Sequence, residues 1–142
     1  MTPRDHGRPG TAPLRILVVD DNADGAEALC AVLTAMGCET CVAFDGAHGW
    51  VAAQAFDPGL VFLDLEMPDM SGCDLARRFR AAPVRSAARL VCLTGHGHAE
   101  DERLCMAAGF DDFFTKPIRL ESLLAVVAAA NAAAPSRPNA VT

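Results

Sequence analysis

Five side chains that could act together in one reaction stand at the ends of short apolar runs in the sequence. In chain order they are Asp20, Asp21, Asp64, Thr94 and Lys116. Three carboxylates close together repel one another, so at least one pKa would rise unless a cation compensates the charge. Carboxylate oxygens favour Mg²⁺ or Mn²⁺, while an ammonium and a hydroxyl can each meet an oxygen of a phosphoryl group. The set therefore predicts phosphoryl transfer onto an aspartate.

The elements that must position these side chains alternate between short apolar runs and amphipathic stretches. Predicted strands cover residues 14–20, 38–44, 59–65, 88–95 and 111–115, and predicted helices cover residues 22–37, 45–56, 71–83, 98–109 and 119–133. The first, third and fourth strands are nearly continuous hydrophobic runs, which is typical of strands buried on both faces of a parallel sheet. The second strand alternates more, which suits an edge of the sheet.

Five β–α units of this kind, joined by right-handed crossovers, predict a doubly wound α/β sandwich. In such a sheet the functional crevice lies at the carboxyl ends of the strands. All five candidate side chains stand at such ends, so we expect the fold to bring them together. Each also has a common structural role, as a helix cap, a turn residue or a surface lysine, and only their joint occurrence in this order indicates a functional site.

Length and composition limit the remaining possibilities. The chain has 142 residues, of which 51% are hydrophobic and 21% charged, as is typical of one globular domain. Its net charge of −6 argues against bulk binding of nucleic acid, which requires basic surfaces. No apolar run approaches the roughly 18–20 residues of a membrane span, and the N-terminus lacks the apolar segment of a secretory signal. We therefore expect a cytoplasmic protein that binds neither a membrane nor nucleic acid directly.

The cysteines predict reduced thiols rather than disulfide bonds, because most of them lie in apolar segments and the chain shows no secretory signal. They are Cys30, Cys38, Cys41, Cys73, Cys92 and Cys105. Cys38 and Cys41 form a single C-x-x-C pair. No second pair or histidine follows at the spacing of a zinc site, so this pair predicts no metal binding.

Four motifs, LVVDDN, LDLEMPDMSG, CLTG and TKP, resemble those of the receiver domain of two-component response regulators. The resemblance covers about residues 14 to 130. It implies a flavodoxin-like, doubly wound parallel sheet of five strands in the order 2-1-3-4-5, with five helices. We expect a free-standing receiver domain over residues 14–132, with disordered tails over residues 1–13 and 133–142 and no effector domain after it.

The resemblance also implies roles for the acids at the matched positions. Asp64 resembles the phosphoacceptor of the family. Asp20 and Asp21 resemble the acidic pair that holds Mg²⁺, with Asp21 as the more direct ligand. The backbone carbonyl of Glu66 would be a further ligand of the ion.

Four other residues match positions that, in this family, contact the phosphoryl group or respond to its arrival. Thr94 resembles the switch hydroxyl that turns toward the phosphoryl group, and Lys116 resembles the lysine that forms an ion pair with it. Pro117 would follow a cis peptide bond that helps to aim this lysine. Phe113 occupies the aromatic switch position, where many family members have tyrosine. It can be a movable ring or an ordinary core phenylalanine, and both interpretations stand.

Two more side chains, those of Glu66 and His96, would border the phosphoryl group and tune how fast water attacks it. The Glu66 carboxylate could orient this water or repel it, and the sequence favours neither. Apart from this role, the sequence favours solvated loop histidines at both His96 and His98.

The resemblance implies that a sensor histidine kinase or a histidine phosphotransfer protein donates the phosphoryl group. The face formed by the predicted elements 98–109, 111–115 and 119–133 would then change and be read by a downstream protein. The domain would be a signalling domain rather than an enzyme, with at most self-dephosphorylation. A receiver cut from a hybrid histidine kinase is the alternative, although Met1 and the two tails favour a free-standing protein.

Two other classes of protein share parts of the pattern. Phosphatases with an aspartyl nucleophile also end a strand on aspartate and use Mg²⁺. They typically carry a second aspartate two residues later, where this chain has Glu66, and the chain leaves no room for their cap domain. Flavodoxin-like flavin proteins need a phosphate-binding loop rich in Ser, Thr and Gly after the first strand. The corresponding loop here, DDNADG, would repel a phosphate unless a metal ion lay between them.

Overall fold

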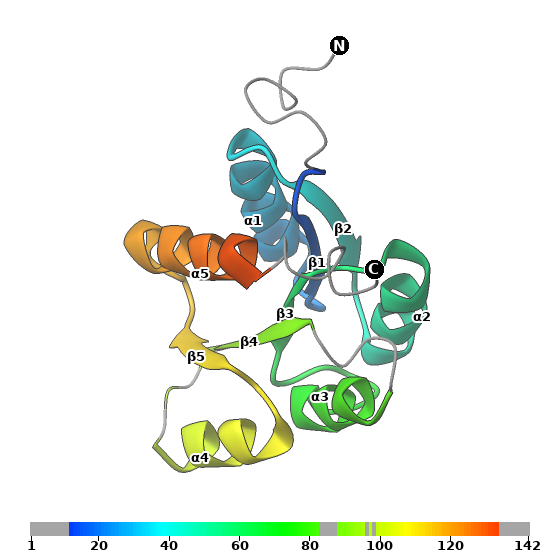
Figure 1. Ribbon diagram of the computed structural model, residues 1–142. Coiled ribbons are helices and arrows are strands. Elements are labelled where there is room, and N and C mark those ends of the chain that lie inside the picture. The colour runs from blue at the N-terminus through cyan, green and yellow to red at the C-terminus, as the bar shows by residue number, and fades with distance from the viewer. Residues whose placement is uncertain (1–11, 83–87, 96, 98, 134–142) are drawn as a thin grey trace.

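A computed structural model of the chain describes residues 12–82, 88–95, 97 and 99–133. Strands and helices alternate along these residues, as Figure 1 shows. The strands are β1 (Arg15–Val19), β2 (Glu39–Ala43), β3 (Leu60–Asp64), β4 (Arg89–Thr94) and β5 (Asp112–Thr115), and the helices are α1 (Ala23–Ala35), α2 (Gly46–Phe56), α3 (Gly72–Ala81), α4 (Ala99–Ala108) and α5 (Leu120–Ala133). Each of these elements lies within the range that the sequence predicts for it.

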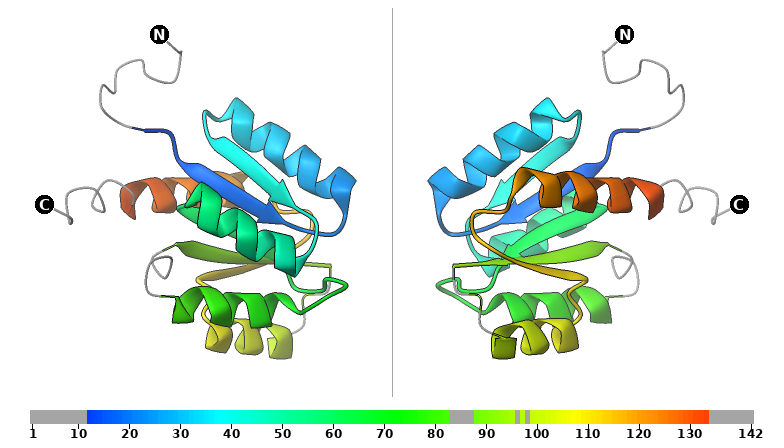
Figure 2. Two further views of the ribbon diagram at one scale, coloured as in Figure 1. Left: turned by 90° about the vertical axis from the view of Figure 1, so that its right-hand side faces the viewer. Right: turned by 90° about the vertical axis from the view of Figure 1, so that its left-hand side faces the viewer.

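The five strands form one parallel sheet in the order β2-β1-β3-β4-β5. This is the expected flavodoxin-like order, and β2 lies at an edge as its alternating pattern predicts. Helices cover both faces of the sheet: of two opposite views in Figure 2, one has α2 in front of the sheet and the other has α5. The predicted doubly wound α/β fold is therefore confirmed.

The sheet separates two hydrophobic clusters, because successive residues of a strand point to opposite faces. On one face, Phe62 of β3 packs in a cluster with Leu33 of α1 and Val126 of α5. On the other face, Leu63 packs in a cluster with Phe79 of α3. Burial of a large apolar side chain contributes about 1.5–3 kcal/mol to folding. The two clusters therefore hold the ends of the strands in fixed places.

The cysteines are free thiols in the structure, as expected from the sequence. Cys73, Cys92 and Cys105 come from α3, β4 and α4 and meet in the interior. The Sγ atom of Cys105 lies 3.5 Å from that of Cys92 and 3.8 Å from that of Cys73. Burial raises the pKa of Cys105 to about 12 and also raises the pKa of Cys92. Both groups are therefore uncharged thiols at neutral pH.

Polar caps fix where the first three helices begin. The side chains of Asn22, Asp45 and Ser71 accept hydrogen bonds from backbone N–H groups in the first turns of α1, α2 and α3. Each cap of this kind contributes about 1 kcal/mol. Asn22 and Ser71 lie close in sequence to the predicted site residues, so the caps also shape the loops that surround the site.

Several expectations concern residues outside the described ranges. Residues 1–11 and 134–142 lie outside them, so the disordered tails and the domain limits stay predictions. Helix α5 ends at Ala133, just beyond the expected limit at residue 132. His96 and His98 also lie outside the described residues. Within the described ranges, no helix combines the length and the apolar character needed to cross a membrane.

Candidate functional site

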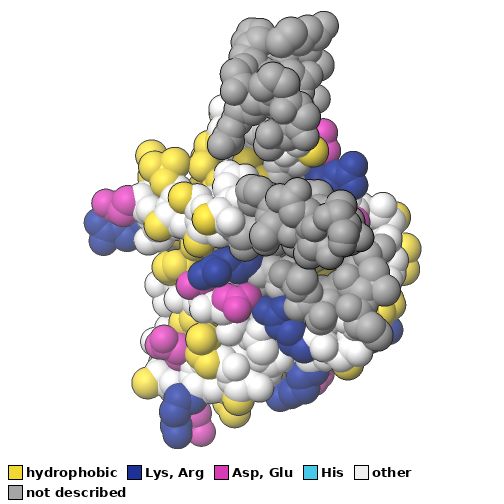
Figure 3. Space-filling view, in the orientation of Figure 1, with side chains coloured by type: hydrophobic (Ala, Val, Ile, Leu, Met, Phe, Trp, Pro, Cys, Tyr) yellow, Lys and Arg dark blue, Asp and Glu magenta, His cyan; other side chains and the backbone are white. Residues whose placement is uncertain are grey.

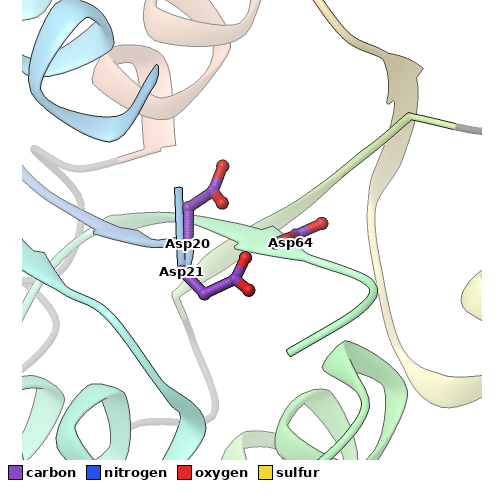
Figure 4. Close-up of side chains that lie close together, drawn as sticks. All are labelled: Asp20, Asp21 and Asp64. Carbon is purple, nitrogen blue, oxygen red and sulfur yellow. The ribbon is translucent and has the colours of Figure 1, made fainter. Parts of the chain in front are cut away.

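The three candidate acids meet at the carboxyl edge of the sheet. Asp20 and Asp21 directly follow β1, and Asp64 is the last residue of β3. One carboxylate oxygen from each of these residues lies within 4.8 Å of the oxygens from the other two. Figure 4 shows Asp20 and Asp21 at the end of β1, beside Asp64 at the end of β3. The fold thus brings together acids that are far apart in the sequence.

Thr94 and Lys116 complete the edge from the neighbouring strands. Thr94 ends β4, Lys116 directly follows β5, and the Lys116 N–H donates to the Thr94 carbonyl at 2.7 Å. The Lys116 Nζ atom lies 2.7 Å from Oδ2 of Asp20 and 3.5 Å from Oδ1 of Asp64. The peptide bond between Lys116 and Pro117 is cis. The lysine therefore contacts acids from two different strands.

Burial makes it unfavourable for all three carboxylates of the cluster to be ionised at once without a bound cation. Asp20 and Asp64 are only 6% and 7% exposed, whereas Asp21 is an exposed residue. Burial, and after it the negative charge of Asp20, raises the pKa of Asp64 to about 6, although Lys116 acts in the opposite direction. One ammonium thus does not compensate the three carboxylates, and the remaining negative charge favours a bound cation.

Lys116 supplies a permanent positive charge in this cluster. Burial alone would lower its pKa, but the hydrogen bond to Asp20 and the charges of Asp64 and Asp20 outweigh burial. The pKa of Lys116 is therefore raised above its usual value. The side chain stays protonated across the neutral range.

Backbone groups hold the buried acids in place. Oδ1 of Asp20 accepts a hydrogen bond from the Asn22 N–H at 2.9 Å, and the Asp20 N–H donates to the Ala43 carbonyl at 3.0 Å. Oδ1 of Asp64 accepts a longer hydrogen bond, at 3.4 Å, from the Glu66 N–H. Hydrogen bonds from the backbone thus orient both carboxylates.

The loop between β3 and α3 is closed on itself beside Asp64. The Leu65 carbonyl accepts a hydrogen bond from the Gly72 N–H at 2.8 Å, and Glu66 and Ser71 form an antiparallel bridge. Position 72 requires glycine, because a Cβ atom there would lie 2.4 Å from the Asp64 carbonyl oxygen. The loop therefore keeps the Glu66 backbone next to Asp64, while Glu66 as a residue is exposed.

Asp69 is a polar residue of this loop that the sequence did not single out. Its two carboxylate oxygens accept hydrogen bonds from the N–H groups of Gly46 and Ala47, each at 2.9 Å. These partners lie 23 and 22 residues earlier in the chain, at the start of α2. No local pattern could therefore have indicated the contact.

Phe113 lies in β5, half-buried against the cluster that contains Cys92. A half-buried ring has both packing contacts and a route to solvent, so its position fits a core role and a switch role alike. Movement of Phe113 therefore stays a prediction.

A groove of about 540 Å³ opens beside the acidic cluster, between α1 and the start of α5. Its lining is mainly apolar and includes Leu29, Val32 and Leu120, and Asp20 and Lys116 also line it. Val32 is 41% exposed and Leu120 is 60% exposed. Sequence patterns predict the apolar face of each helix, but not that the two faces leave a groove between them.

Comparison with known proteins identifies the family of the chain. The family model described as the response regulator receiver domain matches residues 16–128. The DNA-binding response regulator MtrA of Mycobacterium tuberculosis is 41% identical over 115 residues, which are 81% of this chain and 49% of that protein. Hybrid signal transduction histidine kinase L of Dictyostelium discoideum is 30% identical over an alignment of 121 residues, and the match covers 80% of this chain and 7% of that protein. The chain spans about half the length of the MtrA relatives that it matches.

Solved structures agree with this assignment. The crystal structure of a putative response regulator from Chloroflexus aurantiacus has a TM-score of 0.80 and 27% sequence identity to this chain, and the match covers 85% of this chain and 99% of that one. The strand order and the four sequence motifs are consistent with the same family. The chain therefore belongs to the response regulator receiver domain family.

Proposed function

We propose that this domain accepts a phosphoryl group on the carboxylate of Asp64 and signals through the structural change that follows. One observation carries the proposal: the buried Asp64 carboxylate lies beside both the Asp20–Asp21 pair and the ammonium of Lys116. A nucleophile in this position has positive charge available for the oxygens of an incoming phosphoryl group.

Asp20, Asp21, Asp64 and the backbone carbonyl of Glu66 would hold a Mg²⁺ or Mn²⁺ ion. The side chains present fit such an ion, because their ligand atoms are oxygens and because burial, followed by the charge of Asp20, raises the pKa of Asp64. When bound, the ion supplies positive charge to the oxygens of the phosphoryl group.

The phosphodonor would be a phosphohistidine on a sensor histidine kinase or a histidine phosphotransfer protein. An Asp64 oxygen attacks the phosphorus, a P–O bond forms, and the P–N bond breaks. The leaving imidazole keeps the electron pair of that bond and takes up a proton. The Lys116 Nζ atom, 3.5 Å from Oδ1 of Asp64, is placed to contact an oxygen of the arriving group. Later attack by water returns the Asp64 carboxylate and inorganic phosphate.

The groove between α1 and α5 supports a protein as the donor. It leads along an apolar surface to Asp20 and Lys116, so a partner that covers the groove could place its phosphohistidine at the site. An exposed apolar surface of this kind is typical of an interaction site.

The signal would leave the domain through the face formed by α4, β5 and α5. Thr94, which is 1% exposed, would turn its hydroxyl toward the phosphoryl group, and Phe113 would follow it. Leu104 of α4 and Leu120 and Leu124 of α5 are 53%, 60% and 48% exposed. Figure 3 shows hydrophobic side chains at the surface over α5. Apolar groups at the surface support readout of this face by a downstream protein.

A receiver that belongs to a hybrid histidine kinase is the second candidate, and the similarity to kinase L favours it. Family membership supports a signalling domain over a phosphatase with an aspartyl nucleophile. Absence of direct contact with nucleic acid stays a prediction, because the MtrA relatives, of which this chain spans about half, are DNA-binding response regulators.

Intact-protein mass spectrometry after incubation with acetyl phosphate tests the proposal. We expect wild-type protein to gain the mass of one phosphoryl group in the presence of Mg²⁺ and not in the presence of EDTA. Asp64→Asn should gain none under either condition. Absence of an adduct from wild-type protein with acetyl phosphate and with phosphoramidate would overturn the proposal. Continuous release of phosphate from phosphomonoesters would favour the phosphatase instead.

A further inference from the structure

Two acids share the N-terminus of α2, and they come from different parts of the chain. Asp45, the N-cap, accepts from the His48 N–H at 2.8 Å. Asp69, from the loop after β3, accepts from the N–H groups of Gly46 and Ala47. The first N–H groups of a helix lack partners within the helix and carry partial positive charge, so carboxylates bind there favourably. These two hydrogen bonds also hold the pKa of Asp69 below its usual value, which keeps the group charged.

Packing of Met70, the residue after Asp69, reinforces the contact between this loop and the start of α2. A Cβ atom added to Gly46 would lie 2.4 Å from Cγ of Met70, which places the Met70 side chain directly against the start of α2. Asp69 and Met70 therefore dock the loop on α2 through two neighbouring residues. The same loop carries Glu66, and the isolated bridge between Glu66 and Ser71 joins the beginning of the loop to its end.

The segment that leads into α2 is also hydrogen-bonded to Asp20, which belongs to the acidic cluster. The Ala43 carbonyl, at the end of β2, accepts a hydrogen bond from the Asp20 N–H at 3.0 Å. The connection from Ala43 to Ala47 is thus joined to Asp20 at one end and to the Glu66 loop, through Asp69, at the other. It therefore links the two backbone segments that carry the candidate metal ligands, in addition to the direct pairing of β1 with β3.

We infer that Asp69 is a positioning residue for the metal site, because its carboxylate docks the loop of Glu66 on α2 and so fixes the Glu66 carbonyl relative to Asp20 and Asp64. The inference rests on the proposed function, which places a divalent cation at this cluster. Residues that orient metal ligands from outside the ligand set typically change metal affinity by about 10–100-fold when they are replaced. The ordinary alternative is that Asp69 only stabilises α2.

The Mg²⁺ affinity of the unphosphorylated protein, measured by isothermal titration calorimetry, separates these two roles. We expect Asp69→Ala to raise the Mg²⁺ Kd by about tenfold. Asp69→Asn keeps one acceptor oxygen and should give a smaller increase. Phosphorylation by acetyl phosphate should return to nearly the wild-type rate at saturating Mg²⁺, because positioning changes affinity more than the chemical step.

Asp45→Ala is the matched control. It also removes an acid from the N-terminus of α2, but its hydrogen bonds go to His48 within that helix. We expect it to lower the melting temperature about as much as Asp69→Ala does while leaving the Mg²⁺ Kd unchanged. Equal increases in Kd for the two variants would mean that any loss of capping weakens the site, and the inference would be wrong.

A second pair of variants tests the docking without touching a charge. Gly46→Ala should push Met70 and its loop away from α2 and raise the Mg²⁺ Kd, because the added methyl group overlaps the Met70 side chain. Met70→Ala in the same chain should restore the Kd toward wild type. A Kd that Gly46→Ala leaves unchanged in a folded protein contradicts the inference.

Asp21→Asn distinguishes failure of this inference from failure of the proposed function. If Asp21→Asn abolishes Mg²⁺ binding and Asp69→Ala leaves it intact, the metal site stands and only the role of Asp69 is wrong. If Asp21→Asn has no effect on Mg²⁺ binding, the proposed metal site itself is wrong. If Asp69→Asn loses as much affinity as Asp69→Ala and high salt removes the loss, Asp69 acts through its charge and not through positioning.

Discussion

Asp64 is the residue on which the proposed chemistry depends, and its surroundings are unfavourable without a cation. It ends a strand whose other residues are all buried, and its carboxylate faces that of Asp20. The charge of Lys116 and the hydrogen bond from the Glu66 N–H lower the pKa of Asp64, but burial and the charge of Asp20 outweigh them. A divalent ion would reverse the conflict, so the same feature that destabilises the folded state prepares the site for its ligand.

The raised pKa of Asp64 predicts a pH-dependent cost to stability. Between pH 3.8 and about 6 the folded protein keeps a proton on Asp64 that the unfolded chain releases, so ionisation disfavours folding as pH rises. We expect wild type to become less stable than Asp64→Asn over this window, by on the order of 1–2 kcal/mol at pH 7 without Mg²⁺. Urea unfolding of both proteins at several pH values measures the difference. A difference that does not change with pH would contradict the assignment of this pKa to Asp64.

Helices α1 and α5 form the surface on which we place the phosphodonor. Val32→Glu puts a charge into the apolar groove at a position that is already 41% exposed, so the fold should tolerate it. We expect transfer from a phosphorylated histidine phosphotransfer protein to slow by roughly tenfold, the effect of about 1.4 kcal/mol at an interface. Phosphorylation by acetyl phosphate should not change.

Ala31→Glu is the control for this variant, because it places the same charge at an exposed position of α1 that does not line the groove. Both transfer rates should stay at wild-type values. Equal slowing by Ala31→Glu and Val32→Glu would show a general effect of negative charge on the donor rather than contact in the groove.

Strands were the easiest elements to predict, and they carry most of the site. Apolar runs such as Ile16–Val19 are buried on both faces, which is typical of a central strand in a parallel sheet. Once the strands are parallel, Asp20, Asp64 and Lys116 must lie at one edge. The sequence could not indicate the Asp69 contact, because it depends on where α2 begins relative to a loop 22 residues later. The groove likewise depends on how α1 and α5 pack together.

At the scale of the whole molecule, the burial of each cysteine predicts how readily its thiol reacts. Cys73, Cys92 and Cys105 lie where α3, β4 and α4 meet, and burial raises the pKa of Cys105 to about 12. Because thiolates react and thiols do not, Cys92 and Cys105 should be labelled only when the domain unfolds globally. We expect iodoacetamide to modify the half-buried Cys41 first, as followed by peptide mass spectrometry. Labelling of Cys105 as fast as Cys41 in native buffer would mean that α4 opens readily without unfolding of the core.

The central claim is that Asp64 is the phosphoacceptor, and chemical trapping of the acyl phosphate tests it most directly. The protein is incubated with acetyl phosphate and Mg²⁺, reduced with sodium borohydride, digested and sequenced by mass spectrometry. Borohydride converts an aspartyl phosphate to homoserine, so we predict homoserine at position 64 only in samples that contained both donor and Mg²⁺. Homoserine at position 20 or 21, or a stable phosphate on a serine, threonine or histidine with position 64 unchanged, would contradict the claim.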